Sequence, residues 1–215
     1  MKVFEKNDYD DKYYKNLYIK PLIMRLGLNK LYHIWTAYFC LIKKAGLTKK
    51  SKVLDVGCGV GNLVLTLRKL KIKAYGFEPS IAAKKYSVAP KFCFYGKYKK
   101  LPFADRKFDL VFTNEVLEHI SEDNISILMK EMHRISHGNM IHMICVKERG
   151  KIIYNDKTHL TLKNEKWWEN KFKTLGFNVI TGNKFYFFSN LFKVLTGELN
   201  LFSINKGYFF LTAIK

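Results

Sequence analysis

The chain has 215 residues, 48% of them hydrophobic and 26% charged, which excludes a disordered polypeptide and indicates one globular domain with a full core. Lysine and arginine number 38 against 18 acidic residues, and the resulting net charge of +20 makes nucleic acid one candidate partner. The basic residues are spread along the whole chain, however, so a solvated basic surface is the favoured interpretation.

The cysteines and the N-terminus indicate a cytoplasmic protein. Four cysteines, Cys40, Cys58, Cys93 and Cys145, are widely separated and form no CxxC pair, which favours reduced thiols over a zinc site. The N-terminus is too polar for a signal peptide. The most apolar early stretch, residues 31–42, is too short to span a bilayer, and we expect no transmembrane segment.

The first fifty residues are predicted to be helical. Helices are expected over residues 11–26, with breaks near Pro21 and Gly27, and over residues 30–46, ending at Gly46. We expect residues 1–50 to form an N-terminal helical cap over a cofactor site. Residues 51–215 are expected to form a single globular domain below it.

After residue 50, strands and helices alternate. Strands are predicted at residues 52–57, 73–78, 91–95, 108–114 and 139–146. Helices are predicted at residues 62–70, 80–88 and 164–176, and in a segment with Ile125, Leu128, Met132 and Ile135 on one face. This order predicts an α/β fold with a doubly wound, mostly parallel sheet and helices on both faces. Two closing strands, residues 177–188 and 206–215, lack a clear crossover helix between them and suggest an antiparallel edge.

The stretch VLDVGCGVGNL, residues 53–63, places three glycines after the first of these strands and before a helix. Glycines there permit a tight turn and let a ligand lie against backbone N–H groups at the helix N-terminus. Glu78 ends the next strand, where a carboxylate accepts hydrogen bonds from ribose hydroxyls. Both signals indicate a nucleoside-like cofactor. The spacing G-C-G-V-G, with Asn62 at the position of a third dinucleotide glycine, argues against a dinucleotide.

Four segments, taken in order, resemble class I S-adenosylmethionine-dependent methyltransferases: VLDVGCGVGNL, YGFEPS, LPFADRKFDLVFTNEVLEHI and DKTHLTLKNEKWWENKFKTLGF. The resemblance implies a Rossmann-like, seven-stranded sheet with an antiparallel last strand, and S-adenosyl-L-methionine as cofactor. It implies that Asp55 and the Gly57–Gly61 loop bind the methionine half of the cofactor and that Glu78 binds the ribose. The expected cofactor contacts are Asp55, Gly57, Cys58, Gly59, Gly61, Asn62, Glu78, Pro79, Tyr98 and Asn114.

The adenine side departs from the family pattern. The family often has Gly-Asp-Ala before the LPF segment, and the aspartate accepts a hydrogen bond from the adenine amino group. This chain has Gly96, Lys97 and Tyr98 there, and a lysine side chain has donors but no acceptor. Stacking on Tyr98 and a bond to a backbone carbonyl are the two alternatives.

The segment NEVLEHI, residues 114–120, follows the fourth strand. In a helix, Glu115, Glu118 and His119 would share one face. The pattern E-x-x-E-H is similar to that of metal-dependent ubiquinone-pathway O-methyltransferases and small-RNA 2′-O-methyltransferases, which also use a later histidine, here His159. The resemblance implies Glu115, His119 and His159 as catalytic residues. It also implies a divalent cation such as Mg²⁺, held by Glu115, Glu118, His119 and His159, that acidifies the acceptor hydroxyl.

Two interpretations of this segment remain open. Glu118 and His119 either bind a metal, or they pack, hydrogen-bond or orient the substrate without one; the second interpretation is favoured. The favoured function is methyl transfer to a small-molecule, lipid-like or sugar acceptor at oxygen. One alternative is an RNA methyltransferase that uses a divalent metal. Another is a catalytically silent, cofactor-binding regulatory protein, for which Lys97 alone argues. For the Phe-rich stretch 185–202, core packing is favoured over contact with a membrane surface.

Overall fold

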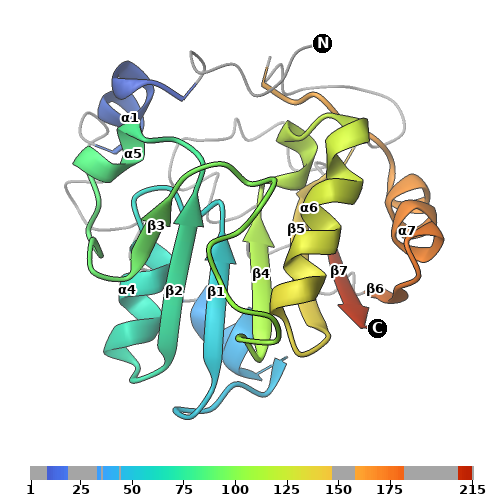
Figure 1. The fold of residues 1–215 in the computed structure, drawn as a ribbon, viewed down its shortest axis with the longest axis horizontal. Coiled ribbons are helices and arrows are strands. Elements are labelled where there is room, and N and C mark those ends of the chain that lie inside the picture. The colour runs from blue at the N-terminus through green and yellow to red at the C-terminus, as the bar shows by residue number, and fades with distance from the viewer. Residues whose placement is uncertain are drawn as a thin grey trace, which may run out of the picture.

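The computed structural model describes residues 9–18, 33–34, 36–43, 45–146, 158–181 and 208–214 (Figure 1). Within this part of the chain the strands form one seven-stranded sheet in the order β3-β2-β1-β4-β5-β7-β6. The strands are β1 (Lys52–Val56), β2 (Lys73–Glu78), β3 (Cys93–Tyr95), β4 (Leu110–Asn114), β5 (Asn139–Cys145), β6 (Asn178–Thr181) and β7 (Tyr208–Ile214). The Phe-rich stretch lies outside the described residues.

The sheet is parallel except at one strand. β1 lies at the centre and pairs in parallel with β2 and β4, so that Val53 lies beside Ala74 and Leu110. β3 and β5 extend this parallel arrangement on either side. β7 pairs antiparallel with both β5 and β6. The predicted doubly wound, mostly parallel fold with an antiparallel last strand is confirmed.

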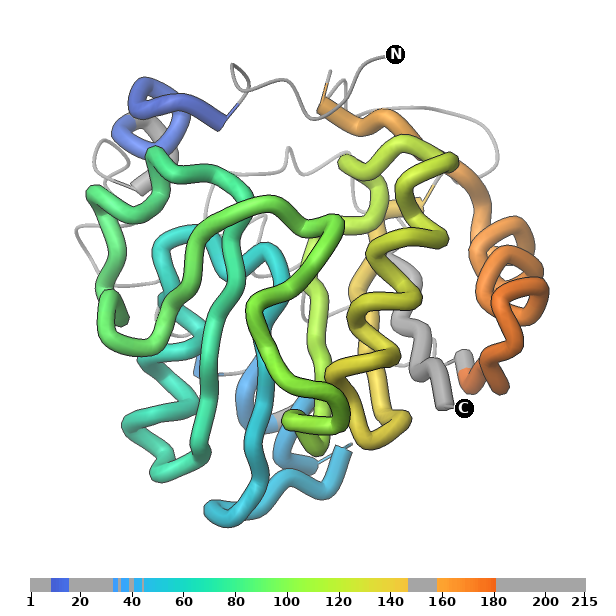
Figure 2. Tube along the Cα trace, viewed as in Figure 1, coloured from blue at the N-terminus to red at the C-terminus, as the bar shows by residue number. Residues whose placement is uncertain are grey.

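Helices cover both faces of the sheet because successive strand residues point to opposite sides. Val53 belongs to the core shared with α4 (Asn62–Lys69) and with the π-helix η1 (Thr36–Lys43). Leu54 belongs to the core on the other face, under α6 (Glu122–Ile135) and α7 (Glu165–Thr174). Figure 2 shows α6 crossing in front of the strands. The predicted apolar stripe of α6 is confirmed, because Ile125, Leu128, Met132 and Ile135 are all buried.

At the carboxyl edge of the sheet, the structure describes a helix from the predicted N-terminal cap. α1 (Asp11–Tyr18) lies there beside the one-turn helix α5 (Ala82–Lys85) (Figure 1). By contrast, η1 packs inside the domain, where Ala37 and Leu41 are fully buried. Beyond Tyr18, the end of the first predicted helix lies outside the described residues. No helix in the described ranges has the length and hydropathy needed to span a bilayer.

Candidate active site

The glycine turn connects the end of β1 to the start of α4 at the carboxyl edge of the sheet. Gly57, Gly59 and Gly61 all have positive φ angles, of 78°, 53° and 88°, which side chains disfavour. Gly57 also has no room for a side chain, because a Cβ there would collide with Cγ2 of Val116. The Gly57 and Cys58 N–H groups donate to the carbonyl of Phe77 at 2.7 and 3.2 Å, which ties the turn to β2.

Glu78 holds the middle of this turn. Its Oε2 accepts a hydrogen bond from the Gly59 N–H at 2.9 Å, and its Oε1 accepts one from the Ser80 N–H at 2.8 Å. The side chain is 6% exposed. Burial raises the pKa of Glu78, while the Ser80 and Gly59 N–H groups and a hydrogen bond from Tyr14 act in the opposite direction. The carboxylate therefore lies directed at the glycine turn, as the sequence predicts.

Asp55 lies on β1 below the turn and is 4% exposed. Burial, together with the nearby Cys93 and Glu78, raises the pKa of Asp55 to about 8. The sequence suggests that Asp55 also braces the turn by accepting its N–H groups. The structure gives that task to the Phe77 carbonyl and to Glu78 instead. The Gly57–Gly61 turn contains no lysine or arginine, and the acidic side chains beside it suit a cofactor that has no phosphate.

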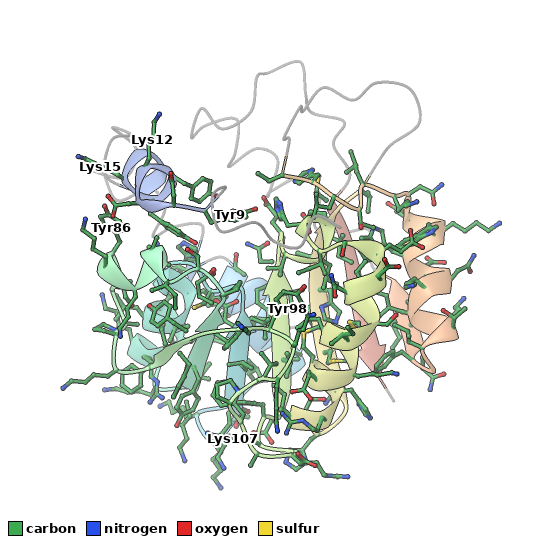
Figure 3. The ribbon with its side chains drawn as sticks, turned by 45° about the horizontal axis from the view of Figure 1, so that its top comes forward. Tyr9, Lys12, Lys15, Tyr86, Tyr98 and Lys107 are labelled. Atoms are coloured by element: carbon green, nitrogen blue, oxygen red, sulfur yellow. The ribbon has the colours of Figure 1, made fainter. Side chains whose placement is uncertain are left out.

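The remaining predicted cofactor contacts lie around the turn. Cys58 is buried, whereas Asn62, Pro79 and Asn114 are half-buried at the start of α4, after β2 and at the end of β4. Tyr98 is 7% exposed and packs in the core with residues such as Leu101 and Phe103. Its ring is near the middle of the molecule (Figure 3), and stacking on adenine remains a prediction. Lys97 is exposed.

The segment 114–120 does not form the continuous helix in which Glu115, Glu118 and His119 would share one face. Glu115 has a positive φ of 54°, and only a single 3₁₀ turn, η2 (Leu117–His119), follows it. Glu115, Glu118 and His119 therefore do not share the face of one helix. The physical reason is that the Glu115 N–H donates to the Met143 carbonyl at 2.9 Å, which extends the contact with β5 and turns the chain before a helix can begin.

Glu118 is a buried brace between three segments. It is fully buried, and its Oε1 accepts a hydrogen bond from the Cys145 N–H at 2.9 Å. Its backbone carbonyl accepts hydrogen bonds from the Leu160 and Thr161 N–H groups, both at 2.9 Å. Glu118 therefore fixes the end of β5 and the segment before α7 against η2. This agrees with the packing interpretation of the sequence.

His119 is the last residue of η2 and is half-buried. Its Nδ1 lies 2.8 Å from the phenol oxygen of Tyr9 and 2.9 Å from Oγ1 of Thr158. The Thr158 carbonyl is 3.2 Å from the same nitrogen. The His119 ring also meets the ring of His159 edge to face, with centroids 4.6 Å apart. The structure therefore brings two of the predicted catalytic residues together.

Among the described residues, one group of possible metal ligands converges. Glu118, Cys145 and His159 each offer a ligand atom, and these atoms lie within 4.8 Å of one another. Of the four predicted ligands this group includes Glu118 and His159 but not Glu115 or His119. A thiol in the group does not fit Mg²⁺, which prefers oxygen ligands. The donor set O, S and N fits a borderline cation such as Zn²⁺.

Several residues of the site were not predicted from the sequence. Tyr14 forms a hydrogen bond with Glu78 beside the glycine turn. Tyr9 and Thr158 contact His119 from distant parts of the chain. No local spacing marks them, although a tyrosine-rich stretch at residues 9–14 does indicate a cap. Cys145 is also missed, because sequence spacing shows only that the cysteines are far apart.

Comparison with known proteins agrees with this arrangement. A family model described as a methyltransferase domain matches residues 31–182. A malonyl-[acyl-carrier protein] O-methyltransferase of Hamiltonella defensa is 30% identical over 124 residues. That match covers 53% of this chain and 45% of the relative, so it spans less than half of the relative's length.

Solved structures share the fold at low sequence identity. A Haemonchus contortus phosphoethanolamine N-methyltransferase, in complex with phosphomonomethylethanolamine and S-adenosylhomocysteine, has a TM-score of 0.67 and 16% identity, over 97% of this chain and 60% of that one. An S-adenosylmethionine-dependent methyltransferase from Aquifex aeolicus has a TM-score of 0.59 and 17% identity, over 87% and 96% of the two chains. Because the family model matches most of the chain, the protein belongs to the methyltransferase domain family.

Proposed function

We propose that this methyltransferase acts on an oxygen atom of a small-molecule acceptor, with His119 as the general base. The observation that carries the proposal is the placement of His119 at the carboxyl edge of the sheet, with Nδ1 held at 2.8–3.2 Å by Tyr9 and Thr158. A hydroxyl is a weak nucleophile until its proton is removed, so a positioned imidazole supplies what transfer to oxygen requires.

The cofactor half of the proposal rests on Glu78 and the glycine turn. When bound, S-adenosylmethionine supplies a methyl group on a sulfonium that is an excellent leaving group. Glu78 would bind the ribose hydroxyls, since a carboxylate with two oxygens can accept from ligands and from backbone N–H groups together. Asp55 and the Gly57–Gly61 turn would bind the methionine half. His119 would take the proton from the acceptor hydroxyl as the acceptor is held in line with the methyl group.

Three classes of acceptor fit the proposal: a lipid-like molecule, a sugar and an acyl carrier. The O-methyltransferase name of the Hamiltonella defensa relative supports oxygen as the methylated atom, although the match covers under half of that protein. An RNA acceptor is the second candidate, and the net charge of +20 is the observation that favours it. RNA binding that falls steeply with salt would support this candidate.

A borderline divalent cation at Glu118, Cys145 and His159 is a proposed addition to the site. Such a cation would lie at the same edge of the sheet as His119. There it could bind the acceptor oxygen and lower the pKa of the acceptor hydroxyl, which would lessen the need for His119 as a base. The donor set supports Zn²⁺ and not the Mg²⁺ that the sequence pattern implies.

The test of the proposed function is methyl transfer from radiolabelled S-adenosylmethionine to a panel of hydroxyl-bearing lipids, sugars, acyl carriers and RNA. The proposal expects transfer to one class of hydroxyl, and a loss of about 100-fold or more in kcat for His119→Ala. Transfer to nitrogen or carbon acceptors alone, or full activity of His119→Ala, would refute it. S-adenosylhomocysteine binding without methyl transfer to any acceptor would favour the catalytically silent, cofactor-binding alternative.

A further inference from the structure

Tyr9 connects the cofactor side of the site to the acceptor side. Its backbone carbonyl accepts a hydrogen bond from Oγ of Ser80 at 2.7 Å, two residues after Glu78. Its phenol oxygen lies 2.8 Å from Nδ1 of His119, after β4. Because β2 and β4 flank β1 in the sheet, one residue reaches from one side of the glycine turn to the other. Figure 3 shows Tyr9 projecting from the start of α1 toward the centre of the molecule.

The helix α1, which begins two residues after Tyr9, is docked on the cofactor side. Asp11 accepts hydrogen bonds from Lys85 at 3.0 Å and from Tyr86 at 2.9 Å, at and beside α5. Tyr14 is 3% exposed and packs with Val60 in the glycine turn and with Ala83 in α5. Its hydrogen bond to Glu78 joins α1 to the carboxylate that faces the turn. The position of Tyr9 therefore depends on contacts made around the cofactor site.

The contacts of His119 define which ring nitrogen carries the proton. A carbonyl oxygen only accepts, so the 3.2 Å contact between the Thr158 carbonyl and Nδ1 requires a hydrogen on Nδ1. The Tyr9 hydroxyl donates its own hydrogen to Oγ1 of Thr158 at 3.3 Å, and its oxygen then accepts from Nδ1. All of these contacts agree when the lone pair is on Nε2. That is the tautomer in which Nε2 can act as a base.

We propose that Tyr9 is a positioning residue, which holds His119 in the Nδ1-protonated tautomer when α1 is docked over the cofactor site. It acts through His119 and does not itself touch the reacting atoms. The inference rests on the proposed role of His119 as the base, and it adds a link between the two halves of the site. Docking of α1 around Glu78 thereby sets the orientation and tautomer of the base on the acceptor side.

The test is Tyr9→Phe, read by nitrogen-15 NMR of the histidine rings in protein saturated with S-adenosylhomocysteine. His119→Gln identifies the His119 signals. In the wild type, the shifts should report hydrogen on Nδ1. In Tyr9→Phe, the tautomer ratio should move about fivefold toward hydrogen on Nε2, which corresponds to about 1 kcal/mol for one lost hydrogen bond. S-adenosylhomocysteine affinity should change little, because phenylalanine keeps the ring and the backbone carbonyl that binds Ser80.

Tyr86→Phe is the matched control, because it removes a phenol hydroxyl near α1 while Lys85 still binds Asp11 and keeps the helix docked. It should leave the His119 signals unchanged. Identical His119 signals in the wild type and in Tyr9→Phe, or an equal change in Tyr86→Phe, would overturn the inference. These outcomes are distinct from failure of the proposed function, which would appear as wild-type protein that does not bind S-adenosylhomocysteine.

Discussion

The N–H of Gly59 donates a hydrogen bond to Oε2 of Glu78 at 2.9 Å, across 19 residues of sequence. One carboxylate at the end of β2 thus shapes the turn that follows β1. The same carboxylate is the candidate ligand for the cofactor ribose. This hydrogen bond fixes the central glycine of the turn to the end of β2. Loss of Glu78 should therefore affect both the shape of the turn and the binding of the cofactor.

Glu78→Gln should weaken S-adenosylhomocysteine binding about 10- to 100-fold, the effect of losing one or two hydrogen bonds to a charged group. The amide keeps the size of the side chain but places an NH₂ group against the N–H of Gly59 or Ser80, which also donate. Calorimetry measures the affinity. Asp109→Asn is the matched control, because Asp109 accepts the Lys52 N–H at 2.7 Å at the other end of β1. Equal S-adenosylhomocysteine affinities of the wild type, Glu78→Gln and Asp109→Asn would mean that Glu78 does not bind the cofactor.

Gly59→Val should abolish S-adenosylhomocysteine binding in protein that still folds. A branched side chain at φ 53° is strained and would also occupy the space of the ligand. Gly46→Val separates the two effects, because Gly46 has a similar φ of 66° and a Cβ there meets nothing within 4 Å. Both variants should lose stability, by about 1–2 kcal/mol in thermal or urea unfolding. Only the Gly59 variant should lose the ligand, and retention of normal affinity would contradict the assignment of the turn.

Stability should fall as the pH rises from 6.5 to 8, because of Asp55. Its pKa is about 8 in the folded protein, against about 3.9 for an unfolded aspartate. Between these values the folded state holds a proton that the unfolded state has lost. The unfolding free energy therefore decreases with pH, by up to about 1.4 kcal/mol per pH unit, and levels off above pH 8.

The pH range of this test starts at 6.5 because a buried histidine has the opposite effect on the unfolding free energy below that pH. Burial lowers the pKa of His142 to about 3, so His142 adds stability as the pH rises toward 6.5 and nothing further above it. Urea unfolding of the wild type and of Asp55→Asn between pH 6.5 and 8 isolates the carboxyl group. The asparagine variant should show the smaller decrease. Parallel curves for the two proteins would mean that Asp55 is ionised in the folded state.

A cation site at Glu118, Cys145 and His159 should be visible with Co²⁺. A thiolate ligand gives cobalt a charge-transfer band in the near ultraviolet, and a site of this kind should saturate at one ion per chain. Cys145→Ser should remove the band, whereas Cys93→Ser, which alters another buried thiol, should keep it. Absence of the band in the wild type would mean that no cation binds there and that the role of Glu118 is structural. Methyl transfer by His119 would not be affected by that result.

Much of the fold could be predicted from the sequence, because the periodicity of apolar residues and the glycines that end helices or form turns are local signals. The strands from β1 to β5, the stripe of α6 and the glycine turn all follow from them. The spacing of Glu115, Glu118 and His119 would suit a helix, but a hydrogen bond from the Glu115 N–H to Met143 on the neighbouring strand keeps this segment from forming one. Tyr9 and Cys145 could not be placed, since their partners are distant in sequence and meet them only through the topology of the sheet.

The central claim, that the glycine turn and Glu78 bind an adenosyl cofactor, is tested most directly by titrating wild-type protein with S-adenosylhomocysteine in a calorimeter. Saturable binding at one ligand per chain, weakened by Glu78→Gln and lost in Gly59→Val, is the predicted result. A wild-type protein that is folded by circular dichroism and gives no binding heat at millimolar ligand would contradict the account.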